Sequence, residues 1–257
     1  MLHNCKTLEN YKLDSLDGGI GRVRDFYFDD RHWTIRYLVA DTGTWLRGRQ
    51  VLISPHSLVA AIKDDKHIAV DLSKRQIEES PSLEEDQPVS RQFEEKYFSH
   101  HGWVGYWGGP LAWGIYPFPG AAAVAAPEPP DKVPGGSDGD PHLRSTHHVT
   151  GYQIEARDGS IGHVEDFIID DVSWAVRYLV IDTKNWWPGR KVIVSPQWLE
   201  DISWTDAVIR FALTREEIKN APEFTEQTLI SREYEADLHG HYRREPYWAS
   251  GEAAARS

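Results

Sequence analysis

The stretch DGGIGRVRDFYFDDRHWTIRYLVADTGTWLRGRQVLISPHSL at residues 17–58 recurs without a gap as DGSIGHVEDFIIDDVSWAVRYLVIDTKNWWPGRKVIVSPQWL at residues 158–199. Roughly half of the aligned positions are identical, and an internal repeat of this kind decides the fold before any single motif does. The offset of 141 residues also aligns further residues. These pairs are Ser90, Arg91, Glu94 and His100 with Ser231, Arg232, Glu235 and His241, and Tyr106-Trp107 with Tyr247-Trp248. The chain is therefore a duplication, and we expect both copies to adopt one fold.

Each copy is rich in short stretches of β-branched and aromatic residues, which favour buried or half-buried strands. An Asp-Gly pair at 17–18, and again at 158–159, is a strong turn signal because glycine adopts positive φ without a Cβ clash. For the first copy we expect strands near residues 11–14, 20–29, 34–41, 49–53, 58–63 and 67–71. This is too little strand for a standard sandwich, so the pattern favours a small closed or half-closed barrel.

Each copy ends in a helical and aromatic tail. Ser73 and Thr214 have the character of N-caps for short helices that end before Pro81 and Pro222. A second helix is expected to start at Ser90 and at Ser231, with an apolar residue every four positions on one face. The predicted class is mainly β with short helices (α+β).

The predicted domains are a first unit over residues 1–101, a linker over 102–141 and a second unit over 142–257. Residues 102–127 carry no charge, which raises the question of a membrane span. Four prolines and six glycines in that stretch would leave backbone groups unpaired in lipid, so we expect no transmembrane segment. We expect residues 102–120 to pack on a barrel, while peripheral membrane association stays open.

The formal net charge of -12 argues against a nucleic-acid partner, because such proteins gain affinity from Lys and Arg that displace counterions. The single Cys5 excludes an intrachain disulfide and a thiolate metal cluster. The opening residues have no apolar core of the kind found in a secretion signal, so a cytoplasmic location is expected.

Charged residues within apolar strands are costly unless they are paired, so we expect structural ion pairs in both copies. The candidates are Asp25, Arg36, Asp41 and Arg49, with their counterparts Asp166, Arg177, Asp182 and Arg190. Asp41 and Asp182 in particular should bond to Arg49 and Arg190 or to nearby backbone amides of the turn between them. A catalytic carboxylate pair is the sharper interpretation, but paired charges kept in both copies suit architecture at least as well.

Histidines invite a metal hypothesis at His100-His101, His147-His148 and His239-x-His241. Adjacent histidines point apart on a helix, and no carboxylate or cysteine lies at a recognised spacing, so no metal site is expected. No glycine-rich nucleotide motif, phosphate loop or nucleophile elbow occurs either. The sequence therefore predicts neither a catalytic residue nor a cofactor, and it does not predict an enzyme.

The repeated pattern DG.IG.V.DF..DD..W..RYLV.DT..W..GR.V..SP resembles the PRC-barrel family, named for the cytoplasmic domain of the photosynthetic reaction centre H subunit. The resemblance covers about residues 11–82 and 152–222, and the tail SREYEADLHGHYRREPYW is similar to that of bacterial tandem PRC-barrel proteins. It implies two tandem small β-barrels that make protein contacts. The chain lacks the transmembrane helix of the H subunit and the N-terminal domain of the ribosome maturation factor, so neither role transfers directly.

The leading functional expectation is a non-catalytic protein-interaction or scaffold module that binds a protein partner or a second copy of itself. Candidate contact residues are Arg22, Arg24 and Arg47, whose counterparts lack that charge, and the aromatic residues Trp45, Trp103, Trp107 and Trp113. Internal packing of the tryptophans is the competing interpretation. The alternative function is a small-molecule- or metal-binding protein, with hydrolysis as one option, whose site would lie between the two barrels.

Overall fold

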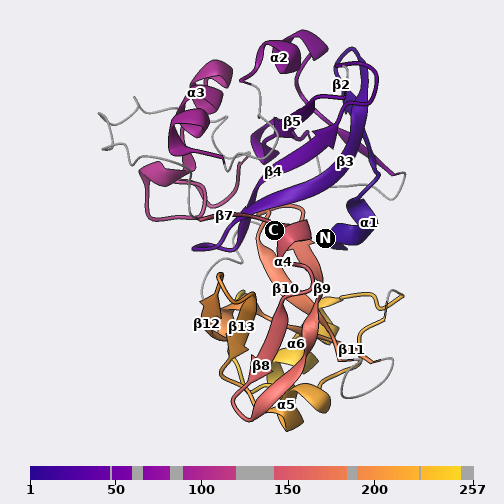
Figure 1. Ribbon diagram of the computed structural model, residues 1–257, viewed down its shortest axis with the longest axis vertical. Helices are drawn as coiled ribbons and strands as arrows, with labels where there is room; N and C mark the ends of the chain where they lie inside the picture. Colours follow the sequence, from indigo (N-terminus) through magenta and orange to yellow (C-terminus); the bar gives the residue numbers. More distant parts are fainter. Residues whose placement is uncertain are drawn as a thin grey trace. The chain divides into compact units, whose positions relative to one another are not determined.

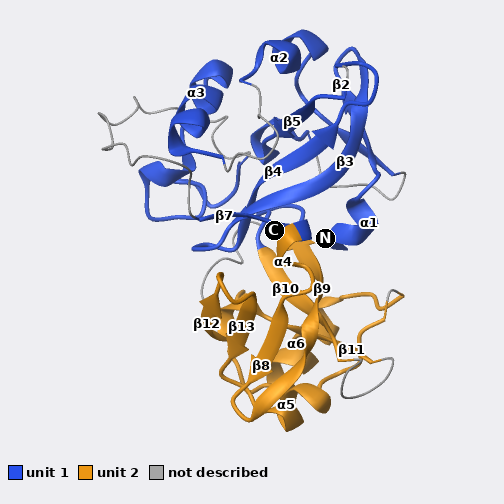
Figure 2. Cartoon of the chain, in the orientation of Figure 1, with its two compact units in different colours: residues 1, 3–147, 170–175 blue, residues 2, 148–169, 176–257 orange. Residues whose placement is uncertain are grey.

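The computed structural model describes residues 1–46, 48–59, 66–81, 89–119, 142–183, 190–225 and 227–249. The chain divides into two compact units, coloured separately in Figure 2. Unit 1 comprises residues 1, 3–147 and 170–175, and unit 2 comprises residues 2, 148–169 and 176–257. The segments 142–147 and 170–175 thus belong to the second copy by sequence and to unit 1 by their contacts.

Each copy has a one-turn helix before its main strands and further short helices after them (Figure 1). The first copy contains β1 (Leu2–Asn4), α1 (Cys5–Leu8), β2 (Lys12–Ser15), β3 (Gly18–Asp29), β4 (Thr34–Asp41), β5 (Gln50–Ile53), η1 (Pro55–Ser57), β6 (His67–Ala69), α2 (Lys74–Glu79), α3 (Arg91–His101) and η2 (Tyr106–Gly108). The second contains β7 (Leu143–Ser145), α4 (Thr146–Val149), β8 (Gln153–Ala156), β9 (Gly159–Asp170), β10 (Val176–Asp182), β11 (Lys191–Val194), η4 (Pro196–Trp198), β12 (Leu199–Ser203), β13 (Val208–Phe211), α5 (Arg215–Lys219) and α6 (Arg232–His241).

The sheet of unit 1 has the strand order β5-β4-β3-β2-β6. Its pairs are antiparallel except β2 with β6, which is parallel, and β7 adds to β3 with Tyr27 opposite Ser145. Residues 34–40 of β4 are all buried, as expected for a central strand covered on both faces. The core gathers the apolar side chains of these strands, among them Leu13, Ile20, Phe26, Phe28, Tyr37, Leu38 and Ile53.

The sheet of unit 2 has the order β11-β10-β9-β8-β13-β12, so corresponding strands pair in the same order in both units. The pair β13 with β8 is parallel, like β6 with β2. Its core includes Ile154, Ile161, Phe167, Tyr178, Leu179, Ile193 and Phe211. The protein is thus mainly β, with two mixed sheets and short helices.

A small closed or half-closed barrel was expected for each copy, and the described residues do not form a closed one. A closed barrel needs every strand to pair on both sides. In the described part of unit 1 the sheet ends at the short strands β5 and β6, which do not pair with each other. Residues 60–63, part of an expected strand, lie outside the described residues.

Glycine is required in the repeated Ile-Gly step because two backbones meet there. A Cβ on Gly21 would overlap the carbonyl oxygen of Asp41, and a Cβ on Gly162 would overlap that of Asp182. Gly21 also has a φ of 131°, which disfavours other residues. The glycine therefore lets β3 pass close to the end of β4, and β9 close to the end of β10.

The helix starts follow the sequence-based expectations. Ser73 and Thr214 form capping boxes with Gln76 and Glu217 at the starts of α2 and α5. Ser90 caps α3 by accepting from the Phe93 amide at 3.1 Å, and Ser231 caps α6 in the same way through Tyr234. Among the described helices, none is long and apolar enough to cross a membrane.

Described residues of the uncharged aromatic segment pack against unit 1, as predicted. Trp113 is fully buried, and its indole Nε1 donates to the carbonyl of Ser173 at 2.9 Å. Trp103 stacks on His56 and on His101. Part of the aromatic segment up to residue 119 is thus packed into unit 1, while Leu111 and Ile115 are exposed, and residues 120–141 of the predicted linker lie outside the described residues.

Candidate functional site

The carboxylate of Glu94 on α3 is one of the fully buried polar groups of unit 1. Its Oε1 accepts hydrogen bonds from the Tyr37 hydroxyl at 2.8 Å and the Tyr106 hydroxyl at 2.9 Å. Its Oε2 lies 2.9 Å from the guanidinium of Arg91. The Arg36 guanidinium lies over the Tyr106 ring, 3.7 Å from its centroid. Strand β4, helix α3 and the aromatic tail therefore meet at one carboxylate.

Unit 2 repeats this cluster around Glu235 on α6. Its Oε1 accepts from Tyr178 at 3.0 Å and from Tyr247 at 2.8 Å, and its Oε2 lies 3.2 Å from Arg232. Arg177 lies over the Tyr247 ring at 3.9 Å. The same side chains at the same offset make the same bonds, so this cluster belongs to the repeated architecture.

The tyrosines of these clusters act as hydrogen-bond donors and not as acids. Burial, followed by the negative charge of Glu94, raises the pKa of Tyr37 and of Tyr106 well above the ordinary value. Burial and Glu235 raise the pKa of Tyr247 to about 12. Their hydroxyls stay protonated at neutral pH and hold the carboxylates in place.

Asp25 and Arg36 were expected to form an ion pair, and the structure gives each a different partner. Arg36 donates to Asp29 at 2.8 Å, and the Arg36 side chain is fully buried. Asp25 accepts from the hydroxyls of Ser145 at 2.6 Å and Thr146 at 2.8 Å. The register of β3 against β4 shifts on both sides of this region, so simple alternation does not tell which charges face each other.

Asp166 and Arg177 hold the equivalent places in unit 2. Both are buried, and Asp166 accepts from the Phe167 amide at 2.7 Å, as Asp25 does from Phe26. The Arg177 guanidinium covers Tyr247. This contact again ties the arginine to the aromatic tail.

Arg49 and Arg190 lie against the short helices that follow the sheets. Arg49 donates to the carbonyl of Ser80 at 3.0 Å, and Arg190 donates to the carbonyl of Ala221. Asp41 is exposed and accepts from the Gly43 amide at 2.9 Å, a backbone amide of the adjoining turn. Asp182 is buried, unlike Asp41.

The tryptophans proposed as contact residues differ in exposure. Trp113 is buried and offers no surface to a partner, which corrects that expectation. Trp103 and Trp107 are half-buried against Phe98 of α3. Trp45 is half-buried with the Lys74 ammonium 5.7 Å from its ring centroid. Internal packing therefore occupies much of this aromatic surface.

Arg22 and Arg24 line a surface pocket of about 620 Å³ on unit 1. The other lining residues come from the loop before β2, from β3, from the end of β4 and the turn after it, and from α4: Glu9, Asn10, Gly21, Val23, Asp41, Thr42, Gly43, Thr44 and His147. Arg22 and Arg24 are both exposed on β3. Arg47, predicted to join them, lies outside the described residues.

The carboxylates of this pocket are already engaged. Glu9 lies 3.1 Å from the His147 imidazole, and Asp41 accepts from the Gly43 amide. Arg22 donates to the carbonyl of Asn10 at 3.2 Å, which holds its guanidinium at the rim. Arg24 has no hydrogen-bond or ion-pair partner among the described residues. The pocket therefore presents cationic donors to solvent.

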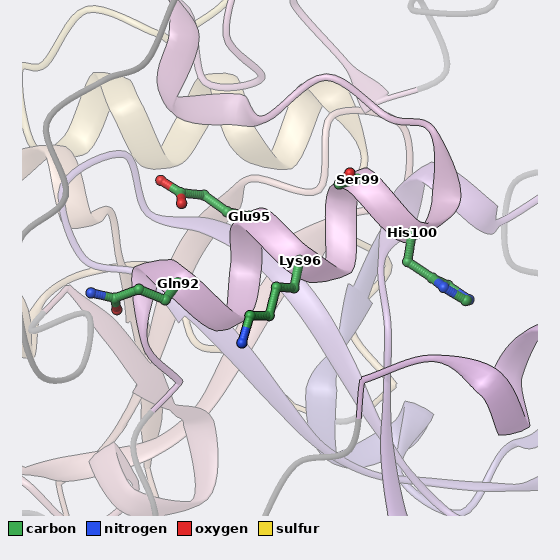
Figure 3. A pocket seen from close by; sticks show the side chains of 5 residues that line it. All are labelled: Gln92, Glu95, Lys96, Ser99 and His100. Atoms are coloured by element: carbon green, nitrogen blue, oxygen red, sulfur yellow. The ribbon is translucent and has the colours of Figure 1, made fainter.

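A second concavity of about 620 Å³ follows the outer side of α3 and is lined by Gln92, Glu95, Lys96, Ser99 and His100. Figure 3 shows these side chains projecting from the helix in different directions, with no convergence on one point. His100 of the predicted histidine pair lies 3.4 Å from the Gln76 carbonyl. This surface has the composition of a solvated helix face.

The histidines singled out from the sequence do not gather into a ligand set in the described residues. His101 stacks on Trp103, and burial lowers its pKa to about 4. His241 bonds to the Glu217 carbonyl at 2.7 Å, and His239 is buried beside Tyr178. A different set, His163, Glu165 and Asp182 in unit 2, does converge, with ligand atoms within 4.8 Å of one another.

Two groups were not identified as functional from the sequence. Glu94 and Glu235 align in the repeat, as do Arg91 and Arg232. The presence of the same glutamate and arginine in both copies could have indicated the buried cluster. The convergence of His163 with Asp182 had no such signal, because it depends on strand register.

Neither a protein-family model nor a curated protein matches this chain.

Proposed function

We propose that the chain is a non-catalytic protein-interaction or scaffold module built from two PRC-type units, and that unit 1 binds an acidic segment of a protein partner. The repeated sequence pattern supports the PRC-type assignment, and the equal strand order of the two mixed sheets supports a duplication of one unit. Known members of the family it resembles make protein contacts through this domain.

The observation that carries the proposal is the pair of exposed arginines in the unit 1 pocket. Arg22 and Arg24 of β3 are both exposed and line the same pocket, while Val23 between them is buried. A planar guanidinium presents a fork of donors that suits a carboxylate. Asn10, Thr42 and Thr44 add polar groups to the same pocket.

The charge of the whole chain selects the class of partner. A net charge of -12 repels a polyphosphate backbone, whereas a short acidic peptide needs only a local cationic site. In unit 2 the corresponding residues are His163 and Glu165, so this site is a property of unit 1 alone among the described residues. The two copies therefore differ in what they bind.

Binding of a labelled acidic peptide, rich in Asp and Glu, tests the proposal, together with quantitative pull-down from native lysate. The double variant Arg22→Gln/Arg24→Gln should weaken peptide binding at least tenfold and release the partner, because two charge-assisted contacts of about 1 kcal/mol or more are lost. Binding should also weaken with added salt.

Arg75→Glu is the matched control, since it changes the net charge by the same amount at an exposed position on α2. This variant should retain the partner. Equal binding by the wild-type chain and the double variant would remove the pocket as the contact site.

A further inference from the structure

Three potential metal ligands converge at one end of the sheet in unit 2. His163 and Glu165 lie on β9, and Asp182 is the last residue of β10. His163 is directly opposite Asp182 in the antiparallel ladder. The side chains of His163 and Glu165 are both partly exposed, whereas Val164 between them is buried. The register of the two strands, not their sequence separation, brings the groups together.

The geometry suits a single bound ion. The candidate ligand atoms lie within 4.8 Å of one another, and His163 Nε2 is 3.9 Å from Glu165 Oε2. Ligands about 2.1 Å from a common metal are separated by roughly 3 to 4 Å, so small side-chain rotations would complete the site. Asp182 is buried while the other two side chains are about one-quarter to one-third exposed, which leaves the site open to solvent on one side.

The donor set selects the class of ion. One imidazole nitrogen and two carboxylate oxygens suit a first-row divalent cation such as Zn²⁺, whereas Mg²⁺ and Ca²⁺ prefer oxygen donors alone. The Lys191 ammonium lies 3.5 Å from Glu165 Oε1, whereas Oε2 is the Glu165 oxygen that lies 3.9 Å from His163 Nε2. The ammonium therefore orients the carboxylate and leaves Oε2 for the ion.

Comparison of the two copies supplies an independent observation. The positions of His163, Glu165 and Asp182 correspond to Arg22, Arg24 and Asp41 in the first copy. There, Arg22 also lies opposite Asp41 in the ladder. The guanidinium groups of Arg22 and Arg24 are thus replaced by an imidazole and a carboxylate in the second copy, while the aspartate is the same in both. The change removes two guanidinium groups and adds two potential metal ligands, while Lys191 replaces Gln50 of the first copy and places one ammonium beside them.

We infer that His163, Glu165 and Asp182 form a binding site for a divalent transition-metal ion of the Zn²⁺ type in unit 2. Three protein ligands leave further coordination positions for water or for a group on a partner. The site is separate from the acidic-peptide pocket proposed for unit 1, and either can fail without the other.

The test is competition for Zn²⁺ between the untagged, chelator-treated full chain and a chromophoric indicator. The wild-type chain should bind one equivalent at this site with a dissociation constant in the micromolar range or below. His163→Gln and Glu165→Gln should each weaken this binding at least tenfold. The double variant His163→Arg/Glu165→Arg, which restores the first-copy residues, should abolish it.

His148→Gln is the control, because His148 is exposed elsewhere in unit 2 and should not affect Zn²⁺ affinity. Circular dichroism and a thermal melt of each variant, with and without Zn²⁺, separate lost binding from lost folding. A wild-type chain that binds no Zn²⁺, or folded His163 and Glu165 variants with wild-type affinity, would overturn the inference.

Discussion

Arg36 donates a 2.8 Å hydrogen bond to Asp29 on the neighbouring strand, and both side chains are buried in unit 1. Burial alone would raise the pKa of Asp29, but the Arg36 charge and hydrogen bonds from Arg36, His32 and the Arg31 amide lower it to about 2. The carboxylate therefore stays ionised in the folded protein far below neutral pH. This buried pair links the stability of the unit to pH.

Asp29→Asn should make stability less dependent on acid pH. Because the folded pKa lies below the ordinary 3.8, the ion pair contributes fully above that value, and its contribution is lost as the pH falls toward 2. The difference between the folded pKa and the ordinary pKa of Asp29 corresponds to about 2 kcal/mol of folding stability. Urea unfolding at pH 7, 4, 3 and 2.5 measures it, with exposed Asp71→Asn as the control. An unchanged pH slope in Asp29→Asn would contradict the role of the pair.

Glu94→Gln should destabilise the protein by roughly 1 to 3 kcal/mol, because the amide cannot serve two tyrosine hydroxyls and Arg91 as the buried carboxylate does. Denaturant unfolding gives the free energy directly. The neighbouring Glu95→Gln is exposed on the same helix and should change stability by less than about 0.5 kcal/mol. Equal effects of the two substitutions would show that the cluster contributes nothing specific.

Gly21→Ala should cost more than about 2 kcal/mol, since the new Cβ overlaps the Asp41 carbonyl and the residue has positive φ. Gly240→Ala on α6 meets no atom within 4 Å and should be neutral or stabilising by up to about 1 kcal/mol. Thermal melting of both variants decides the matter. A tolerated Gly21→Ala would mean that β3 can move away from β4.

Thr146→Val should lower stability by about 1 kcal/mol, because the Thr146 hydroxyl donates to buried Asp25 and valine leaves that acceptor with one donor fewer. Thr7→Val is the control, at an exposed position on the one-turn helix α1. Urea midpoints compare the two. The expected difference reflects that unit 1 is completed by residues from the second copy.

Trp113→Ala should destabilise unit 1 by about 3 to 5 kcal/mol, because a fully buried indole and its hydrogen bond to Ser173 are removed. Ile115→Ala, two residues along the same segment and exposed, should be nearly neutral. Near-ultraviolet circular dichroism and denaturant midpoints report the loss. A tolerated Trp113→Ala would reopen the aromatic segment as a contact surface.

Local features of the fold could be predicted from the sequence because they depend on neighbouring residues. The helix starts at Ser90 and Ser231 could be predicted because a serine hydroxyl accepts a hydrogen bond from a backbone amide of the first turn. The gapless repeat predicted equal strand order, because equal turn lengths preserve pairing. The exposed arginines of the pocket were found as charge differences between the copies.

Side-chain partners and unit boundaries depended on three-dimensional packing. Register shifts in the β3–β4 ladder change which side chains face each other, so Arg36 meets Asp29 and not Asp25. Residues 142–147 and 170–175 complete unit 1 although the repeat assigns them to the second copy, and sequence similarity carries no information on such an exchange. His163 and Asp182 become neighbours through strand pairing alone. Local propensity acts over a few residues, whereas these contacts join positions that meet only when the sheets form.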